Sequence, residues 1–412
     1  MTLESFIDSW IGSDLPVRIR AFDGTDIGPK DAAATLTIHS RDALVRMVTA
    51  PGELGVARAY VAGDIDIEGD IYAVMGLRSE IAGLKMSPSQ VRKLVGLVGI
   101  KNIRRLPPPP EEHHGRGRLH TRNRDADSIS FHYDVSNEFY RLVLGPSYTY
   151  SCAVFEDPSD SLEQAQENKY ELISRKLGLE PGMRLLDIGC GWGGMVLHAA
   201  RHHGVEAVGV TISQNQVDLA RKRVAEAGLA DRIDIRLQDY REVDDGPFDA
   251  ISSIGMFEHV GLQRLGTYFD KLGALLVPGG RAMNHAISRP KPPESTRLHR
   301  SSFIDRYVFP DGELHEVGSV ISALQDHGLE VRHVENLREH YALTLRRWVA
   351  NLEANWDEAV KDAGEGRARV WRLYMAGSAV MFEDNQIHVD QVLAVKTPES
   401  GKSLMPLRPS WV

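Results

Sequence analysis

The stretch Leu185-Leu-Asp-Ile-Gly-Cys-Gly-Trp-Gly-Gly194 decides the fold of this chain. A short apolar run ends in three glycines spaced two apart, at 189, 191 and 193, and a helical pattern follows. Glycines let the backbone turn tightly and let a ligand approach the main chain. The spacing G-x-G-x-G differs from the G-x-G-x-x-G of dinucleotide sites. It predicts a strand, a ligand-binding loop and a helix, with Asp187 ordering the turn or contacting the ligand; the alternative is a tight turn without a ligand.

The sequence around this loop alternates between strand and helix patterns. Because a β-α-β-α order favours a parallel sheet covered by helices on both faces, we expect an α/β fold with ligand sites at the carboxyl ends of the strands. Strands are expected at 184–188, 206–212, 232–240, 248–255 and 281–288, and helices at 195–204, 216–228 and 264–280.

Polar side chains follow three of these strands. Nucleotide-binding sheets usually end the second strand with an acidic residue, but here Thr211, Ser213 and Gln216 supply neutral hydrogen-bonding groups. They are candidate ligand contacts, or Thr211 or Ser213 is an ordinary helix N-cap. Asp239 and Tyr240 are candidates for an adenine amino group and ring, or Asp239 is a turn residue.

Glu258 follows Gly255 after the fourth strand, where a carboxylate can reach what the ligand reacts with. The alternative for Glu258 is surface charge on a loop. Cys190, between the loop glycines, is interpreted as a small packing residue.

The rest of the chain predicts a second, smaller module. Residues 1–103 contain strand patterns at 17–22 and 34–40 and helical patterns at 41–50, 55–63 and 87–103. Residues 104–128 hold four consecutive prolines and many Gly, Arg and His residues, which predicts a linker. The segment 341–390 is expected to be helical, with its apolar side mainly in the core.

Composition narrows the function classes. The 412 residues are 42% apolar and 25% charged, which excludes fibrous and wholly disordered proteins. The net charge of −9 argues against a nucleic-acid binder. The two cysteines, Cys152 and Cys190, fit a reducing compartment. No apolar run is long enough to span a bilayer, and the first residues lack the pattern of a signal peptide.

One segment reverses the charge balance. Between Lys85 and Arg124 there are ten basic and two acidic residues. Basic residues contribute about 1 kcal/mol each near an anionic lipid surface. The segment therefore predicts docking to an anionic membrane; the alternative is a solvated helix face followed by a disordered linker.

Seven stretches of the sequence, in order, carry a further signal: FHYDVSNEFYRLVLGPSYTYSCAVF (131–155), LLDIGCGWGG (185–194), GVTISQNQ (209–216), SIGMFEHVG (253–261), HAI (285–287), DRYVFPDGEL (305–314) and HYALTLRRW (340–348). Together they resemble the cyclopropane-fatty-acyl-phospholipid synthase family and the related mycolic acid cyclopropane synthases. The resemblance covers about residues 125–400.

The resemblance implies an S-adenosylmethionine (SAM)-dependent enzyme with a class I methyltransferase sheet, Rossmann-like, plus a smaller N-terminal α+β domain. The activity implied is the addition of a methylene to the cis double bond of an unsaturated acyl chain in a membrane phospholipid. The cofactor contacts implied are Tyr150, Ser151, Asp187, Gly189, Gly191, Trp192, Gly193, Thr211, Ser213, Gln216, Asp239 and Tyr240. No metal is implied.

In this family a bound bicarbonate is taken to be the base. Its ligands map onto Cys152, Glu258, His285, Ile287 and Tyr341, and all five carry the family residue type. An anion in an apolar pocket needs donors such as an imidazole, a phenol and main-chain N–H groups. Taken singly, these residues would more often be core side chains.

The resemblance also sets expectations for organisation and location. Residues 1–103 would be a lipid-docking domain, 104–128 a linker, and 129–412 the catalytic domain with a helical cover over the acyl pocket. The enzyme would be a homodimer, cytoplasmic and peripheral on the inner face of the membrane.

Gly145-Pro146 stands where the family often has Asp-Pro, which leaves a methylene-branched product open as the alternative to a ring. Two other classes remain as alternatives. One is a methyltransferase acting on a soluble metabolite, and the other is a non-catalytic lipid-binding protein on the same fold.

Overall fold

The computed structural model describes residues 2–11, 15–82, 88–104, 106–113, 135–261, 264–290, 302–310, 312–409 and 411. Contacts divide the chain into two compact units. The first comprises residues 1–114, 299–310 and 352–380, and the second comprises residues 115–298, 311–351 and 381–412. Most of the expected linker, residues 114–128, lies outside the described residues, as do Lys85, Arg105 and the arginines between 116 and 124.

The first unit is an α+β module around a four-stranded sheet of order β2-β1-β3-β4. Strands β1 and β3 are parallel, and the other two pairs are antiparallel. Its elements are α1 (Leu3–Ile11), β1 (Arg18–Ala21), β2 (Asp26–Ile27), β3 (Ala34–Ile38), α2 (Arg41–Thr49), α3 (Glu53–Val61), β4 (Ile65–Gly69), α4 (Ile71–Ala82), α5 (Pro88–Val98), a 3-10 turn (Ile100–Asn102), α12 (Phe303–Tyr307), α15 (Trp356–Ala363) and most of α16 (Glu365–Glu383).

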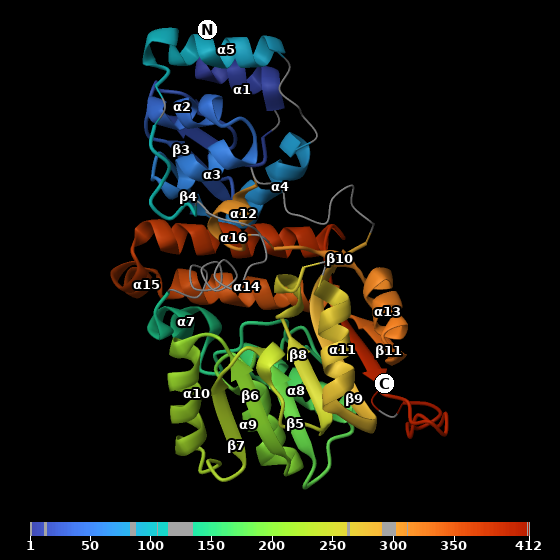
Figure 1. Cartoon of the computed structure of the whole chain (residues 1–412). Helices are drawn as coiled ribbons and strands as arrows, with labels where there is room; N and C mark the ends of the chain where they lie inside the picture. Colours follow the sequence, from blue (N-terminus) through green and yellow to red (C-terminus); the bar gives the residue numbers. More distant parts are fainter. Residues whose placement is uncertain are drawn as a thin grey trace. The chain divides into compact units, whose positions relative to one another are not determined.

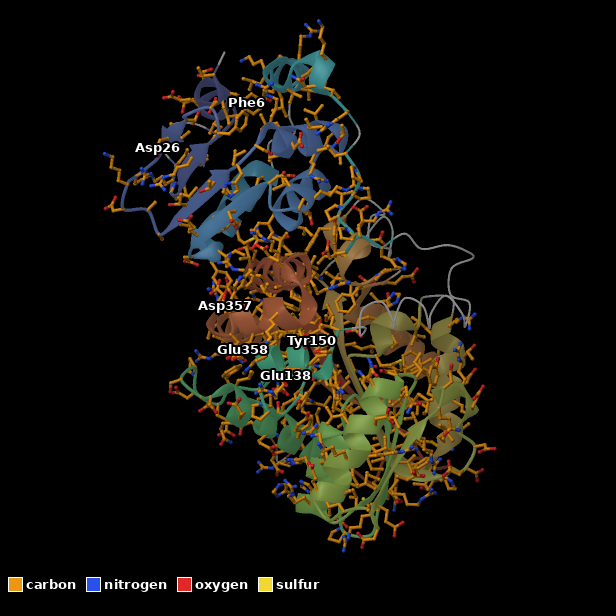
Figure 2. All side chains as sticks on the ribbon, turned by 90° about the vertical axis from the view of Figure 1, so that its left-hand side faces the viewer. Phe6, Asp26, Glu138, Tyr150, Asp357 and Glu358 are labelled. Atoms are coloured by element: carbon orange, nitrogen blue, oxygen red, sulfur yellow. The ribbon has the colours of Figure 1, made fainter. Side chains whose placement is uncertain are left out.

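Burial follows the apolar pattern of these elements. Phe6 on α1 is buried in the core of this unit, whereas Asp26 on the edge strand β2 is exposed and pairs with Arg18 (Figure 2). The expected strands and helices in residues 17–63 are present, and α5 with the following 3-10 turn covers most of 87–103. Helices α1 and α4 and strand β4 were not predicted.

Two arginines of α16 tie this late segment into the first unit. Arg369 donates to the carbonyl oxygens of Tyr60 and Ile65, each at 3.2 Å, and Arg372 donates to that of Ile67 at 3.1 Å. Arg372 also pairs with Glu353. These contacts explain why residues 352–380 group with the N-terminal module. The three-part domain division expected from the sequence stays a prediction.

The second unit contains a sheet of order β11-β12-β9-β8-β5-β6-β7, with β10 paired to β9 (Figure 1). Its elements are α7 (Asn137–Leu144), α8 (Leu162–Leu177), β5 (Arg184–Ile188), α9 (Gly194–His203), β6 (Glu206–Thr211), α10 (Gln214–Glu226), β7 (Ile233–Leu237), a 3-10 turn (Tyr240–Glu242), β8 (Phe248–Ile254), a 3-10 turn (Phe257–His259), α11 (Leu265–Leu275), β9 (Leu276–Arg289), β10 (His315–Glu316), α13 (Val317–Asp326), β11 (Glu330–Asn336), α14 (Arg338–Ala354) and β12 (His388–Val395).

Two apolar cores cover the two faces of this sheet. Alternate residues of a strand point to opposite faces, so Leu185 packs with α8, α9 and α10, while Leu186 packs with α11 and α13. The five strands from β5 to β9 are parallel to their neighbours among them, which confirms the expected α/β fold. The sheet is mixed, because β12 pairs antiparallel with both β9 and β11. Strands β11 and β12 were not predicted from the sequence. No helix among the described residues is long and apolar enough to cross a membrane.

Candidate functional site

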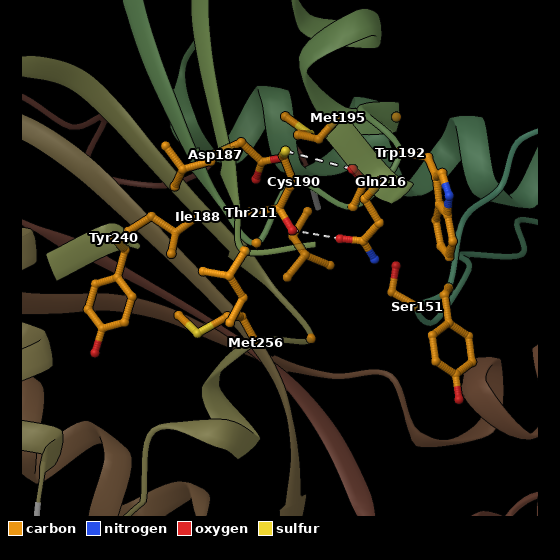
Figure 3. Close-up of a pocket in the computed structure, with 18 of the residues that line it drawn as sticks. Ser151, Asp187, Ile188, Cys190, Trp192, Met195, Thr211, Gln216, Tyr240 and Met256 are labelled. Atoms are coloured by element: carbon orange, nitrogen blue, oxygen red, sulfur yellow. Dashed lines mark hydrogen bonds between the residues drawn. The ribbon is translucent and has the colours of Figure 1, made fainter. Parts of the chain in front are cut away.

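A pocket opens at the carboxyl ends of β5, β6 and β8, where the sequence places its ligand loop (Figure 3). Gly189 and Gly191 line it with φ of 75° and 54°, values that L side chains rarely adopt. In Figure 3, Tyr240 lies at one end of the pocket and Trp192 at the other. Ten of the twelve expected cofactor contacts line this pocket: Tyr150, Ser151, Asp187, Gly189, Gly191, Trp192, Thr211, Gln216, Asp239 and Tyr240.

The other two expected contacts lie at helix starts. Ser213 is the N-cap of α10, and its hydroxyl accepts from the Gln216 N–H at 3.4 Å. Gly193 precedes α9 with φ of 81°. Neither is among the residues that line the pocket. Ser213 thus caps α10, and its role as a cofactor contact stays a prediction.

Hydrogen bonds fix several polar side chains of the pocket. The Thr211 hydroxyl donates to Gln216 Oε1 at 2.7 Å, and the Ser252 hydroxyl donates to Asp187 Oδ1 at 2.6 Å. Burial raises the pKa of Asp187 to about 6. Asp239 accepts from the guanidinium of Arg241 at 2.8 Å, and the ring of Tyr240 meets Tyr268 edge-on at 5.4 Å.

This set of groups fits SAM. Carboxylate, hydroxyl and amide groups suit an amino acid and ribose, and the Tyr240 ring beside Asp239 suits a purine. The glycine loop lets a ligand lie against the main chain. The residues that would hold SAM are therefore those of the pocket wall named above.

The expected bicarbonate ligands lie outside this pocket, in two groups. Three of them gather at β9: His285 and Ile287 lie on this strand, and Glu258 lies on the 3-10 turn after β8. Because β8 ends at Ile254, it leaves residues 286 and 287 of β9 without a β8 partner. Glu258 fills the gap, since its Oε1 accepts from the Ile287 N–H at 2.7 Å. The Ile287 N–H, expected to face bicarbonate, is thus engaged by Glu258. His285 lies two residues earlier on the same strand.

The other two ligands, Cys152 and Tyr341, meet at the carbonyl oxygen of Leu337. It accepts from the Tyr341 N–H at 3.1 Å and from Cys152 Sγ at 3.7 Å. Burial raises the pKa of Cys152, so the thiol stays protonated. The Leu337 N–H donates to the carbonyl oxygen of Val389, which pairs with Ile287 in the sheet, so the two groups are joined through β12.

Two buried polar atoms of the β9 group, Oε2 of Glu258 and Nε2 of His285, have no hydrogen bond to the described residues. Burial raises the pKa of Glu258 and lowers that of His285 to about 3, so the imidazole is neutral near pH 7. Buried polar atoms usually have partners. Each of these two atoms is therefore a candidate contact for a polar ligand.

A chain of hydrogen bonds sets the tautomer of His285. Lys176 donates to Gln391 Oε1 at 2.6 Å, which fixes the orientation of that amide. The Gln391 Nε2 must then donate to His285 Nδ1, at 3.2 Å. The imidazole proton is therefore on Nε2, and His285 is a hydrogen-bond donor at its unpaired side. Sequence reasoning missed both Lys176 and Gln391.

Lys169 on α8 is a second functional candidate that sequence reasoning missed. It is fully buried, lines the cofactor pocket and donates to the Ser151 hydroxyl at 3.0 Å. Burial lowers its pKa to about 7, and its charge acts on Cys152 and Asp187. The sequence does hold a signal for this burial. Lys169 lies four residues after Ala165 and four before Ile173, and both of these are on the buried face of the helix.

Aromatic rings connect the cofactor pocket to Tyr341. Tyr150, which lines the pocket, lies 5.4 Å from Trp348, and Trp348 lies 6.0 Å from Tyr341. Tyr341 in turn contacts Phe382 at 4.7 Å. Tyr148 also lines the pocket and holds an unusual φ of 53°. Strained backbone of this kind clusters at functional sites.

We expect Gly194→Ala to lower the free energy of unfolding by about 1–3 kcal/mol and to weaken SAM binding. The new Cβ would lie 2.1 Å from the Tyr170 hydroxyl, which shares a hydrogen bond of 2.7 Å with Thr149 in the pocket wall. Urea unfolding and calorimetry with SAM measure the two effects. Gly318→Ala is the control, since its Cβ meets nothing within 4 Å. Equal behaviour of the two variants would contradict this account of Gly194.

The chain is similar to proteins that act on fatty acids and mycolic acids. The sequence profile described as mycolic acid cyclopropane synthetase matches residues 120–392. A probable fatty acid methyltransferase of Mycobacterium tuberculosis is 46% identical over 407 residues, which is 96% of this chain and 95% of that protein. A probable fatty acid methyltransferase of Pseudomonas putida is 39% identical, over 95% of both chains.

A solved structure matches about two thirds of the chain. It is the mycolic acid cyclopropane synthase CmaA1 complexed with SAH and CTAB, at 36% identity and a TM-score of 0.62. The match covers 65% of this chain and 97% of that one. The two fatty acid methyltransferases extend over nearly the whole chain, including the N-terminal module.

Proposed function

We propose a reaction for this chain, which belongs to the mycolic acid cyclopropane synthetase family and is a SAM-dependent methyltransferase. The proposed reaction adds a methylene to the cis double bond of an unsaturated acyl chain in a membrane phospholipid and forms a cyclopropane ring. The observation that carries this proposal is the buried pair Glu258 Oε2 and His285 Nε2, which lack partners among the described residues. The fatty acid methyltransferases that match the whole chain support an acyl substrate.

Bound SAM supplies an electrophilic methyl group on a sulfonium. An alkene is a weak nucleophile, so its site must be dry and well aligned. The rings of Tyr150, Trp348 and Tyr341 offer faces that stabilise positive charge developing on the acyl chain without reacting with it. Trp348 and Tyr341 are buried, and the ring contacts run from the cofactor pocket at Tyr150 to Tyr341, which supports this role.

The residues that would hold a bicarbonate base are Glu258, His285 and Tyr341, with Cys152 and Ile287 beside them. His285 carries a proton on Nε2 that suits an anion, and Glu258 Oε2 is an acceptor for an O–H group. The Ile287 N–H bonds to Glu258, so its contribution would be to position that carboxylate.

A methylene-branched product is the second candidate. The two relatives that match nearly the whole chain are named probable fatty acid methyltransferases, and a methylene-branched product is one that a methyltransferase can form. Gly145, where the family often has Asp, ends α7 with φ of 77°, and a Cβ there would lie 2.8 Å from Glu163. A larger residue at position 145 would therefore strain the backbone at this positive φ and require the Glu163 carboxylate to move.

The deciding experiment is mass spectrometry and proton NMR of lipids incubated with the protein, SAM and dioleoyl phospholipid vesicles. We expect a mass gain of one methylene with upfield ring protons. The same mass gain with vinylidene protons would establish the branched product instead. No mass gain, with SAM still bound, would contradict an acyl phospholipid substrate and favour a soluble one.

We also propose that α5 docks the enzyme on anionic phospholipid at the inner face of the membrane. Leu94 and Val98 are buried, while Arg92, Lys93 and Lys101 are exposed on the same segment. The segment thus packs its apolar side chains against its own unit and exposes its basic side chains to solvent.

The double variant Arg92→Gln/Lys93→Gln should weaken partitioning onto anionic vesicles about 30-fold, since each basic residue contributes roughly 1 kcal/mol. Added salt should lower the binding and activity of the wild type. Vesicle co-sedimentation measures both, with SAM affinity as the control for folding. Binding that is independent of salt and of these residues would rule out electrostatic docking.

A further inference from the structure

A cluster of histidine and glutamate side chains joins α8 and α9 in the second unit. The members of this α8–α9 cluster are Glu167, Glu171, His198, His202 and His203. Their possible ligand atoms form two overlapping groups of three, and within each group all atoms lie within 4.8 Å of one another. Neither the methyl transfer nor the proposed base uses any of these residues.

We propose that Glu171, His198 and His203 bind a divalent transition-metal cation, with Zn²⁺ as the best match. Glu171 Oε2 lies 3.3 Å from His198 Nε2 and 3.0 Å from His203 Nε2. Ligand atoms that sit 2.0–2.1 Å from a tetrahedral zinc ion are roughly 3.3 Å apart. The two distances from Glu171 are therefore close to the spacing that zinc requires, and all three ligand atoms lie within 4.8 Å of one another. Two imidazoles with a carboxylate are ligands that zinc favours.

Neighbouring groups orient two of these ligands. His198 Nδ1 is 2.8 Å from Glu167 Oε2, so the carboxylate would receive the Nδ1 proton and leave Nε2 for the metal. Arg175 Nε donates to Glu171 Oε1 at 2.7 Å, which leaves Oε2 facing the imidazoles. Carboxylates that hold the second nitrogen of a ligating histidine are typical of zinc sites.

Burial favours this group of three over the other one. The side chains of Glu171 and His203 are 34% and 18% exposed, whereas that of Glu167 in the alternative group is 56% exposed. Less exposed ligands lose less conformational freedom when they bind. Three protein ligands leave a fourth position for water, as in open zinc sites.

The site would connect α8 to α9 beside the cofactor pocket. Tyr170, next to Glu171, lines that pocket, and its ring lies 5.8 Å from His198. Gly194 at the start of α9 also lines it. A bound cation would thus stabilise two helices that form part of the pocket wall.

The test is a Zn²⁺ titration of the untagged, metal-free full chain in competition with a chromophoric chelator. We expect one equivalent to bind. His203→Ala and Glu171→Gln should each raise the dissociation constant at least about tenfold, as for lost support of a metal ligand. Zn²⁺ should raise the unfolding temperature of the wild type and not of these two variants.

His202→Ala is the matched control, because it removes a neighbouring histidine that belongs only to the alternative group. It should bind Zn²⁺ as the wild type does. Absence of stoichiometric binding to the wild type would overturn the proposal, and so would a loss in His202→Ala equal to that in His203→Ala. Circular dichroism and SAM binding of the variants show that they are folded.

Discussion

Replacing Glu258 by glutamine is expected to lower turnover by about 10²–10⁴-fold while SAM affinity stays unchanged. The side chain keeps its shape, and one amide oxygen can still accept from the Ile287 N–H that Glu258 Oε1 now binds at 2.7 Å. What is lost is the negative charge and the acceptor at Oε2, which has no partner among the described residues. Single-turnover lipid conversion and SAM calorimetry measure the two quantities separately.

Glu242→Gln is the control for this variant. Glu242 is exposed on the 3-10 turn after β7, so its loss should leave turnover unchanged. Loss of SAM binding in Glu258→Gln would show that Glu258 is structural. Unchanged turnover would remove Glu258 from the reaction altogether. Because burial raises the pKa of Glu258, the neutral amide should not destabilise the fold.

Lys169→Met is expected to stabilise the protein by about 1–4 kcal/mol at pH 6, as when a buried charge gives way to an apolar side chain. Burial lowers the pKa of Lys169 from 10.5 to about 7 in the folded state. Below pH 7 the folded protein therefore holds a charge that the interior disfavours. The variant should also bind SAM more weakly, because the Ser151 hydroxyl in the pocket wall loses its donor.

The pH dependence of this effect has a definite sign. Between pH 7 and 10.5 the unfolded chain binds a proton on Lys169 that the folded chain has lost, so wild-type stability rises with pH in that window. The advantage of Lys169→Met should shrink accordingly from pH 6 to pH 10. Urea unfolding of both proteins at several pH values measures it. A constant difference would mean that the ammonium is not disfavoured by burial.

Lys176→Met is the matched control, because Lys176 is also fully buried but is held by acceptors. It pairs with Glu335 and donates to Gln391 Oε1 at 2.6 Å. Its removal leaves a buried amide oxygen without a donor, so this variant should be less stable than the wild type. Two buried lysines are thus expected to give opposite changes in the free energy of unfolding.

The strands that build the cofactor pocket could be predicted from the sequence because each has a local signal. β5 is a short apolar run followed by Gly189, and β8 is followed in the same way by Gly255. β6 is an apolar run that ends at Thr211. The pocket residues Thr211, Gln216 and Tyr240 could be chosen for a related reason, since all three lie at or just after the carboxyl end of a strand, within five residues of it.

Features that depend on distant contacts could not be predicted in this way. β12 carries Asp390 and Gln391 in its interior, so the sequence does not alternate as a half-buried strand would. These polar residues are buried because Ser288, Lys176 and His285 bind them. A lysine such as Lys169 is normally exposed on a helix, and only the fold shows that it is buried.

The position of β12 has a consequence for synthesis of the protein. β12 lies between β9 and β11, yet about 100 residues separate it from β9 in the chain. A ribosome adding about 5–20 residues per second leaves β9 with an open edge for roughly 5–20 s. Open strand edges recruit other chains. The nascent enzyme is therefore most exposed to aggregation just before its last strand emerges, and a chain cut short before residue 388 would retain that open edge permanently.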